Sequence, residues 1–424
     1  LLAFCITASL FPPVGLADGY PDLRDLVVAA ADGVVDLEGQ TIRVNDLDAG
    51  GSRDCPYVIS APVKEIRNGT LLVWASGFVL DTDVKLSNVR LQFATTTGNF
   101  IAANGHSLTL ENVRCINQSG DHSFNLYGGG MTGIYSQFEN FSLPSPGPAG
   151  RIVIEGNVSL QGSSGEGNIY AGNLFRTSDG ADPQKVFSGN VDIVINGTPE
   201  TGALGTVYAC GAEQNGITAV EDPTYAVSGG VTVSGAVPDV AGMDGTRTGV
   251  LYRGGGNQAK RTFTGVSSLS VESGNLVLNL GSWLQNGGSL SLASGAKLDL
   301  QNINEQPLGV HDFSSDGGLL FLASNQSWSI GGQATGTCRV AVGGVNYDGT
   351  QSVQPPVKGH TYIQTPNSSG GSFELLPYGS SKLTLVRDEN GNWTAVEDSS
   401  GGNRDLVQDF HFDTTARTVE AGGE

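Results

Sequence analysis

Short segments in which apolar and polar residues alternate, each bounded by glycine or asparagine, recur along most of this 424-residue chain. An alternation with a period of two is typical of β-strands that bury one face, and glycine is typical of the bends between them. Residues 23–31 differ, because their apolar residues follow helical spacing up to Asp32-Gly33. We therefore predict a predominantly β chain with a short N-terminal helix that covers its first strands.

Three of these segments align without gaps, and each carries an asparagine at its centre: Asn68, Asn88 and Asn112. Asparagine tolerates left-handed backbone and its amide can bond an equivalent residue next door, so it suits a corner between two strands. The alignment predicts that these asparagines stack, buried, at one corner of successive turns of the chain. It also predicts an inward column of Leu71, Leu91 and Cys115, and an outward column of Thr70, Arg90 and Arg114.

A second phrase, an apolar residue followed by tyrosine and a glycine-rich segment, occurs four times between Leu126 and Gly256. Its tyrosines are Tyr127, Tyr170, Tyr208 and Tyr252. They recur at roughly 40-residue intervals, the period of a stacked array whose units bury apolar faces against their neighbours. In such an array repeated aromatic residues stack on their own copies and support it. A carbohydrate-stacking strip is the alternative interpretation of these tyrosines.

The N-terminal helix, the segment Val35-Asp36-Leu37-Glu38-Gly39 and the stacked asparagine corners resemble the right-handed parallel β-helix of pectin-lyase-like proteins. The Val-Tyr-x-Gly-Gly phrases are similar to repeats in large surface proteins and adhesins of Gram-positive and gut bacteria. Together the two resemblances cover residues 18–302. They imply an all-β fold, a right-handed parallel β-helix (solenoid), in a bacterial surface protein, and they bring no catalytic signature.

The sequence divides into four segments. Residues 1–17 have the apolar centre and small-x-small end of a secretory signal peptide, truncated at its start, which predicts a secreted or cell-surface protein. Residues 18–302 are the predicted β-helix with its cap. In residues 303–398 the period changes, and we expect a small antiparallel β cap or accessory domain with a hairpin turn at 388–392. Residues 399–424 are expected to be a linker or tail.

Composition narrows the possible partners. The formal net charge of −20 disfavours nucleic acid and anionic membranes, because both favour lysine and arginine. After the signal peptide no apolar segment is long enough to span a membrane. The five cysteines form no Cys-x-x-Cys motif, and the five histidines have no metal-ligand spacing. We therefore expect no cofactor and no metal, and no disulfide at the inward Cys115 and Cys210.

An enzyme would be centred on the early segments. The resemblance implies that lyases of this fold use carboxylates to hold calcium and a basic residue to take a proton, whereas glycosidases need paired carboxylates. One cluster of candidates comes from the outward column and the adjoining turns: Asp81, Asp83, Arg90, Arg114, Asp121 and His122. Outward charges on such a fold are usually a solvated face. The prediction is a non-catalytic, adhesin-like stalk that binds glycan or a host or microbial surface protein, and a polysaccharide lyase or glycoside hydrolase is the alternative.

Overall fold

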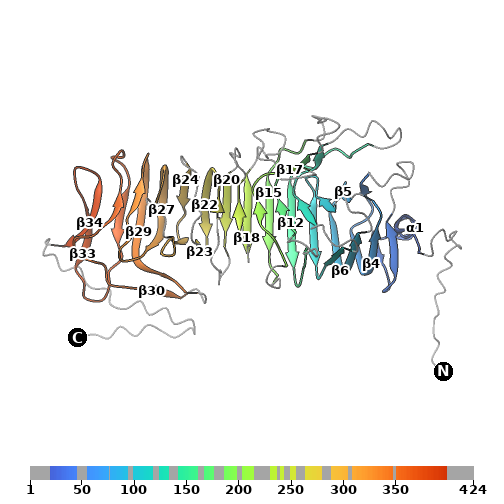
Figure 1. The fold of residues 1–424 in the computed structure, drawn as a ribbon, viewed down its shortest axis with the longest axis horizontal. Coiled ribbons are helices and arrows are strands. Elements are labelled where there is room, and N and C mark those ends of the chain that lie inside the picture. Colours follow the sequence, from blue (N-terminus) through green and yellow to red (C-terminus); the bar gives the residue numbers. More distant parts are fainter. Residues whose placement is uncertain are drawn as a thin grey trace, which may run out of the picture.

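The computed structural model describes most of the chain between residues 20 and 398. The described residues are 20–44, 55–75, 77–93, 99–117, 124–132, 142–160, 167–175, 186–197, 203–213, 230–235, 239–242, 249–254, 263–278, 288–303, 308–346 and 350–398. They form an elongated body in which the strands run across the long axis and follow one another along it (Figure 1). The helix α1 (Leu23–Ala29) lies at one end, and β33 (Leu383–Arg387) and β34 (Asn392–Glu397) lie at the other.

The first sheet contains most of the strands and is predominantly parallel. Its early members are β1 (Val34–Asp36), β2 (Thr41–Val44), β4 (Glu65–Val73), β6 (Val84–Phe93), β8 (Ser107–Glu111), β9 (Arg114–Asn117), β12 (Gly150–Glu155), β15 (Val191–Ile195) and β18 (Val231–Gly235). Its later members are β20 (Gly249–Arg253), β22 (Ser268–Ser273), β23 (Asn275–Val277), β24 (Ser289–Leu292), β25 (Lys297–Asp299), β27 (Asp312–Leu322), β29 (Ala334–Val345), β30 (Gln351–Val353) and β32 (Ser372–Leu375).

The second sheet is parallel, and its strands alternate along the sequence with strands of the first. It contains β3 (Tyr57–Ile59), β5 (Phe78–Leu80), β7 (Phe100–Ala102), β10 (Asn125–Tyr127), β13 (Ile169–Tyr170), β16 (Val207–Tyr208), β19 (Val240–Ala241) and β21 (Phe263–Thr264). A third sheet of β11 (Met131–Thr132), β14 (Leu174–Phe175) and β17 (Ala212–Glu213) packs on its outer side. The fourth sheet contains β26 (Leu308–Val310), β28 (Trp328–Ile330), β31 (Thr361–Gln364), β34 and β33.

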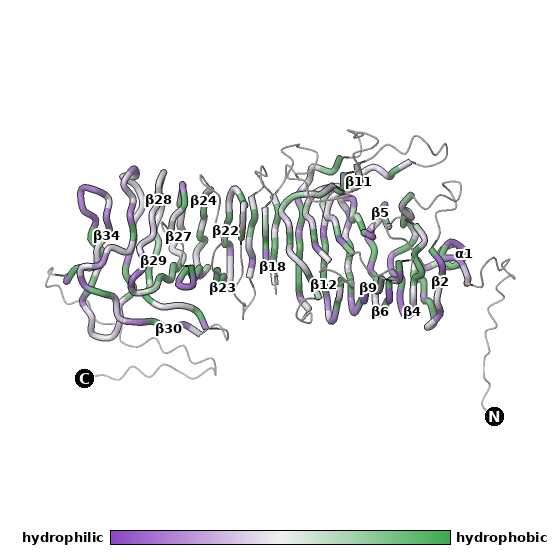
Figure 2. Tube along the Cα trace, in the orientation of Figure 1, coloured by the Kyte–Doolittle hydropathy of each residue, from purple (hydrophilic) through white to green (hydrophobic). Residues whose placement is uncertain are grey.

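Inward side chains stack on their equivalents in the neighbouring strands. Leu71 pairs with Leu91, and Leu91 pairs with Cys115, and all three are buried. One core cluster of buried residues extends from Leu23 to Ala395. Figure 2 shows hydrophobic and hydrophilic positions alternating along the strands, as expected when one strand face is buried. The inward column lies where the sequence predicts it.

The helix α1 covers the first strands. Asp22 is its N-cap and accepts a hydrogen bond from the backbone N–H of Arg24 (3.1 Å), which satisfies one of the amides left open at the start of a helix. Leu23 is fully buried in the core, whereas Val28 on the outer side is 87% exposed. The helix ends at Ala29, two residues before the predicted end at residue 31.

Parallel pairing continues beyond residue 302, where the sequence predicted a change to antiparallel strands. β27 pairs in parallel with β24, β25 and β29, and β29 pairs in parallel with β32. Among the described strands the antiparallel pairs are β29–β30, β31–β34 and β33–β34. The prediction of antiparallel strands is therefore wrong for β29 and β32 and correct for the β33–β34 hairpin. In its turn the Asp388 N–H donates a hydrogen bond to the Asn392 carbonyl (2.9 Å).

Glycines inside the long strands account for this error. Gly317 in β27 has φ +80°, and the register shifts between Asp316 and Leu319. Gly336 in β29 has φ +74°, and a Cβ there would collide with the carbonyl oxygen of Ser315. These glycines bend a strand that continues in parallel, but in the sequence they resemble turns between antiparallel strands.

We expect Leu91→Ala to lower the free energy of unfolding by about 2–5 kcal/mol, because it would leave a cavity in a packed core. The fully buried Leu91 side chain lies between Leu71 and Cys115. Gln92→Ala, next to it on the partly exposed face of β6, is the control and should change stability little. Urea unfolding followed by circular dichroism measures both, and equal losses would contradict the inward assignment of Leu91.

Candidate functional site

The carboxylates of the candidate catalytic cluster lie in turns. Asp81 and Asp83 are exposed between β5 and β6. Oδ1 of Asp83 accepts a hydrogen bond from the backbone N–H of Ser107 (2.8 Å), so this carboxylate caps the start of the next strand of the first sheet. Asp121 and His122 lie outside the described residues.

Arg90 and Arg114 are neighbours in the outward column, and both are exposed. Asp83 is separated from them by five residues of extended strand, roughly 16 Å, before the chain bends at Asn88. Paired catalytic groups of glycosidases lie about 5–10 Å apart. The structure therefore does not bring Asp83 and Arg90 together across one substrate bond.

Asn68, Asn88 and Asn112 form a ladder along one edge of the stack. Their φ angles are +58°, +53° and +52°, all in the left-handed region. Nδ2 of Asn88 donates to Oδ1 of Asn68 (3.4 Å), and Nδ2 of Asn112 donates to Oδ1 of Asn88 (3.3 Å). Oδ1 of Asn112 in turn accepts the N–H of Asn157 (2.9 Å). The three side chains are exposed, so the expectation that they are buried is wrong, because this corner points to solvent.

Three of the four repeat tyrosines stack on one another. The rings of Tyr127 and Tyr170 are 4.9 Å apart and inclined by 9°, and those of Tyr170 and Tyr208 are 4.9 Å apart and inclined by 10°. Tyr127 and Tyr170 are buried with Met131 and Leu174 of the third sheet. Burial raises the pKa of Tyr127 and Tyr170. Their stacking is therefore internal packing, since a buried ring is closed to a sugar.

Tyr252 does not belong to this stack. It lies in β20 of the first sheet and pairs with Val233 and Val271. Its ring is fully buried and lies edge-on to Phe263, with centroids 6.2 Å apart. In the second sheet Ala241 occupies the position that follows Tyr208. The prediction that Tyr252 is a fourth copy in the same column is wrong, because the same short phrase occurs here on a strand of a different sheet.

A second polar column, which the sequence analysis missed, lies two residues before the stacked tyrosines. Oδ1 of Asn125 accepts the N–H of Asn168 (2.9 Å), and Oδ1 of Asn168 accepts the N–H of Thr206 (3.0 Å). The Asn-x-Tyr spacing at residues 125–127 and 168–170 is the sequence feature that indicates it. The column joins successive strands of the second sheet at their starts.

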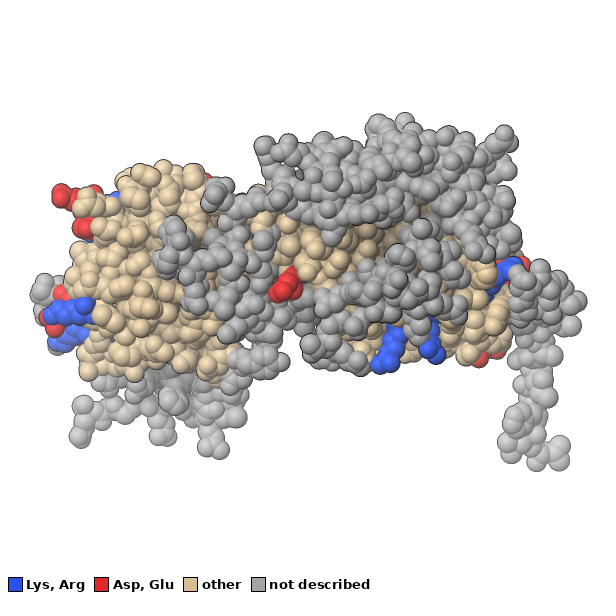
Figure 3. All heavy atoms as spheres, in the orientation of Figure 1, with Lys and Arg blue, Asp and Glu red and all other residues tan. Residues whose placement is uncertain are grey.

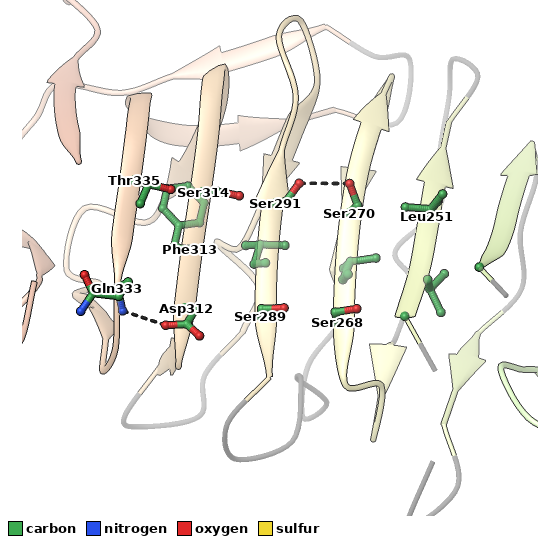
Figure 4. A pocket seen from close by; sticks show the side chains of 15 residues that line it. Leu251, Ser268, Ser270, Ser289, Ser291, Asp312, Phe313, Ser314, Gln333 and Thr335 are labelled. Carbon is green, nitrogen blue, oxygen red and sulfur yellow. Dashed lines mark hydrogen bonds between the residues drawn. The ribbon is translucent and has the colours of Figure 1, made fainter. Parts of the chain in front are cut away.

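The outer face of the first sheet contains a hollow of about 540 Å³ over β20, β22, β24, β27 and β29. Its outward side chains form two columns that run across the strands (Figure 4). One column contains Leu251, Ser270, Ser291, Ser314 and Thr335. The other contains Gly249, Ser268, Ser289, Asp312 and Gln333. We call these ten residues the hydroxyl face, after the serines and threonine that dominate it.

One end of the hydroxyl face carries a carboxylate. Oδ1 of Asp312 accepts the backbone N–H of Gln333 (2.8 Å), and Nδ1 of His311 lies 3.1 Å from Oδ2 of Asp312. The Gln333 N–H, followed by His311, lowers the pKa of Asp312. The Asp312 carboxylate is therefore ionised at neutral pH, and the other described residues that line the hollow have uncharged side chains.

Serine pairs in the sequence are the feature that indicates this face. Ser268-Leu269-Ser270 and Ser289-Leu290-Ser291 each place two hydroxyls on one side of a strand. The Oγ atoms of Ser270 and Ser291 are 3.1 Å apart and share a hydrogen bond. Because β22 and β24 are adjacent and in register, the four hydroxyls form one patch.

Ion pairs occur elsewhere on the same sheet. Arg253 and Glu272 lie 2.7 Å apart on the strands at one end of the hollow, and neither lines it. Further pairs on earlier strands of the sheet are Lys85–Glu111 (2.6 Å) and Arg151–Asp192 (3.5 Å). In the view of Figure 3 the charged side chains that are coloured gather mainly toward the two ends of the molecule.

Cys55, Cys115, Cys210 and Cys338 are buried thiols rather than disulfides. Burial raises the pKa of Cys115 strongly, and it raises that of Cys338 to about 12. In the part of the chain that the structure describes, no three His, Cys, Asp or Glu side chains are grouped to hold a metal ion. The described helical structure includes no segment with the length and hydropathy needed to cross a membrane.

No protein-family model matches the chain, and it matches neither a curated protein nor a solved structure. An interpretation of function therefore depends on the geometry of the hydroxyl face and of the stacked columns.

We expect Asn88→Ala to lower the free energy of unfolding by about 1–3 kcal/mol. An alanine in left-handed backbone costs about 1–2 kcal/mol, and two amide hydrogen bonds are lost as well. Asn88→Gly loses the same hydrogen bonds without the backbone strain, so it should lower the free energy of unfolding less than Asn88→Ala does. Thermal and urea unfolding of the two variants separates the contributions, and an equal loss would show that the left-handed corner adds nothing.

Cys115 and Cys210 should resist alkylation by iodoacetamide at pH 8 in the folded protein, because both are buried and burial raises the pKa of Cys115. After denaturation without reductant, both should be modified completely. Mass spectrometry of peptides from the two conditions measures this. A disulfide between Cys115 and Cys210 would mean that the register of at least one strand differs from the structure.

Proposed function

We propose that the parallel sheets close into a right-handed parallel β-helix. The alternation of consecutive strands between the first and second sheets supports this, because each strand returns beside its predecessor in parallel register. Crossovers between parallel strands are right-handed in nearly all proteins, owing to strand twist. The helix α1 at one end and the β33–β34 hairpin at the other serve as the caps that a solenoid needs.

We propose that this solenoid is a secreted or cell-surface module, an adhesin-like stalk that binds glycan or protein through its lateral face without catalysis. The hollow on the outer face of the first sheet is the observation that carries the proposal, since its hydroxyls are fixed on rigid strands. The signal-peptide pattern of residues 1–17 supports export. Parallel stacking along the long axis suits a stalk, because it holds a binding face away from an attachment point.

A polysaccharide lyase or glycoside hydrolase is the alternative function, and it has less support. General acid–base cleavage needs two ionisable groups across one bond, with at least one tuned toward neutral pH. Among the described residues that line the hollow, Asp312 is the one carboxylate, and its pKa is lowered. A depressed pKa suits a fixed anion and not a proton donor.

The proposal is tested by following binding and turnover together. The protein is incubated with polygalacturonate, alginate, chondroitin sulfate and neutral plant glycans, with and without calcium. We expect retention on a glycan array or a mucin column, with no new reducing ends and no absorbance from unsaturated products. Turnover that Arg114→Ala or Asp121→Ala abolishes would replace the adhesin-like function by the enzymatic one.

A further inference from the structure

We propose that the hollow over the hydroxyl face is a binding site for a neutral glycan chain that lies along the long axis of the stack. This inference rests on the proposed function and narrows it to one site and one ligand class. The hollow has the volume of a small-molecule site, about 540 Å³. Its lining combines hydroxyls at the centre with a carboxylate and an amide at one end and an apolar side chain at the other.

The charge of the lining selects against acidic ligands. Asp312 is the ionised group among the described lining residues, and its pKa is lowered, so the hollow carries a negative charge at neutral pH. Among the described lining residues there is no lysine or arginine, and the nearby Arg253 is engaged with Glu272 at 2.7 Å. Asp312 would repel a uronate or a sulfated sugar, and the described lining residues offer such a ligand no cation, whereas a neutral sugar is not repelled and needs no cation.

The hydroxyl groups of the lining can form the hydrogen bonds that bind a polyol. Each serine or threonine hydroxyl donates one hydrogen bond and accepts others, as a sugar hydroxyl does. Within the described part of the chain, the hydroxyls of Ser268, Ser289, Ser314 and Thr335 have no hydrogen-bond partner in the protein and can serve a ligand. A glycan along the axis meets a hydroxyl on each of β22, β24, β27 and β29, at steps of about 4.8 Å.

The two ends of the hollow differ, which gives a bound chain a direction. At the β20 end Gly249 has no side chain, and Leu251 provides an apolar contact for the C–H face of a sugar ring. At the β27–β29 end the Asp312 carboxylate accepts hydrogen bonds from hydroxyls, and the Gln333 amide can donate or accept them.

A protein partner fits this lining less well. The cores of protein interfaces are enriched in aromatic residues, methionine and arginine, which anchor the partner. Among the described lining residues the aromatic one, Phe313, is an inward residue that is 2% exposed. Leu251 is then the one large apolar side chain that points outward among these described residues. Scattered small hydroxyls suit a polyhydroxylated ligand.

The test compares two double variants of the full chain with the parent protein. Ser270→Gln with Ser291→Gln fills the centre of the hollow with longer neutral side chains, and Ser270→Ala with Ser291→Ala removes the hydroxyls but leaves the space open. Thr109→Gln on β8 is the matched control, because Thr109 points outward from the same sheet and does not line the hollow. Circular dichroism and melting temperature establish that each variant is folded.

Binding is measured by glycan array and calorimetry with neutral glucan, mannan, xylan and galactan oligosaccharides, and with polygalacturonate and chondroitin sulfate oligosaccharides. We expect the parent and Thr109→Gln to bind at least one neutral chain equally. The glutamine pair should abolish that binding, and the alanine pair should weaken it roughly tenfold, since two hydroxyl contacts are lost.

The outcomes separate this inference from the proposed function. Neutral binding that both double variants retain would place the ligand elsewhere and overturn the inference, while the adhesin-like function would stand. Preferential binding of the acidic chains would overturn the ligand class alone. If neither class is retained by the parent protein, the inference fails together with the glycan-binding part of the proposed function.

Discussion

Parallel pairing in register is the constraint on which the rest of this structure depends. In paired parallel strands each residue lies about 4.8 Å from its register partners, so residues of similar character tend to recur at one position. Tyrosine satisfies this by ring stacking, as Tyr127 and Tyr170 do. Like charges at one register position instead repel each other. Arg90 and Arg114 share a register and are exposed, where water and salt screen their repulsion.

This constraint explains which parts of the fold could be predicted from the sequence. The spacing of Asn68, Asn88 and Asn112 indicates a ladder because one residue type has to recur wherever a corner recurs. The position of Tyr252 was predicted wrongly because a two-residue phrase does not specify the sheet to which its strand belongs. That sheet depends on the strands that flank the phrase. The direction of β29 was missed because a period of two is common to parallel and antiparallel strands and because its Gly336 resembles a turn.

The candidate site was less accessible to sequence reasoning for a related reason. Asp83 attracts attention as a carboxylate next to basic residues, yet in the structure it caps a strand by accepting the N–H of Ser107. The hydroxyl face contains no residue that stands out by itself. Ser270 and Ser291 belong to the candidate site only because two adjacent strands align them and because Asp312 lies on the next strand. Such a site depends on register, which no single segment encodes.

Because the hydroxyl face has few charged side chains, the charges that keep the protein in solution have to lie on other parts of its surface. The formal net charge is −20, and ion pairs such as Arg253–Glu272 lie outside the lining of the hollow. The open ends of parallel sheets, which would otherwise pair with other chains, meet α1 at one end and the β33–β34 hairpin at the other. With the ends covered and the charge placed outside the hollow, the hydroxyl face can stay uncharged apart from Asp312. That division of roles is expected if the face is kept for a neutral ligand, because a face maintained for solubility alone would carry lysine and glutamate as the earlier strands do.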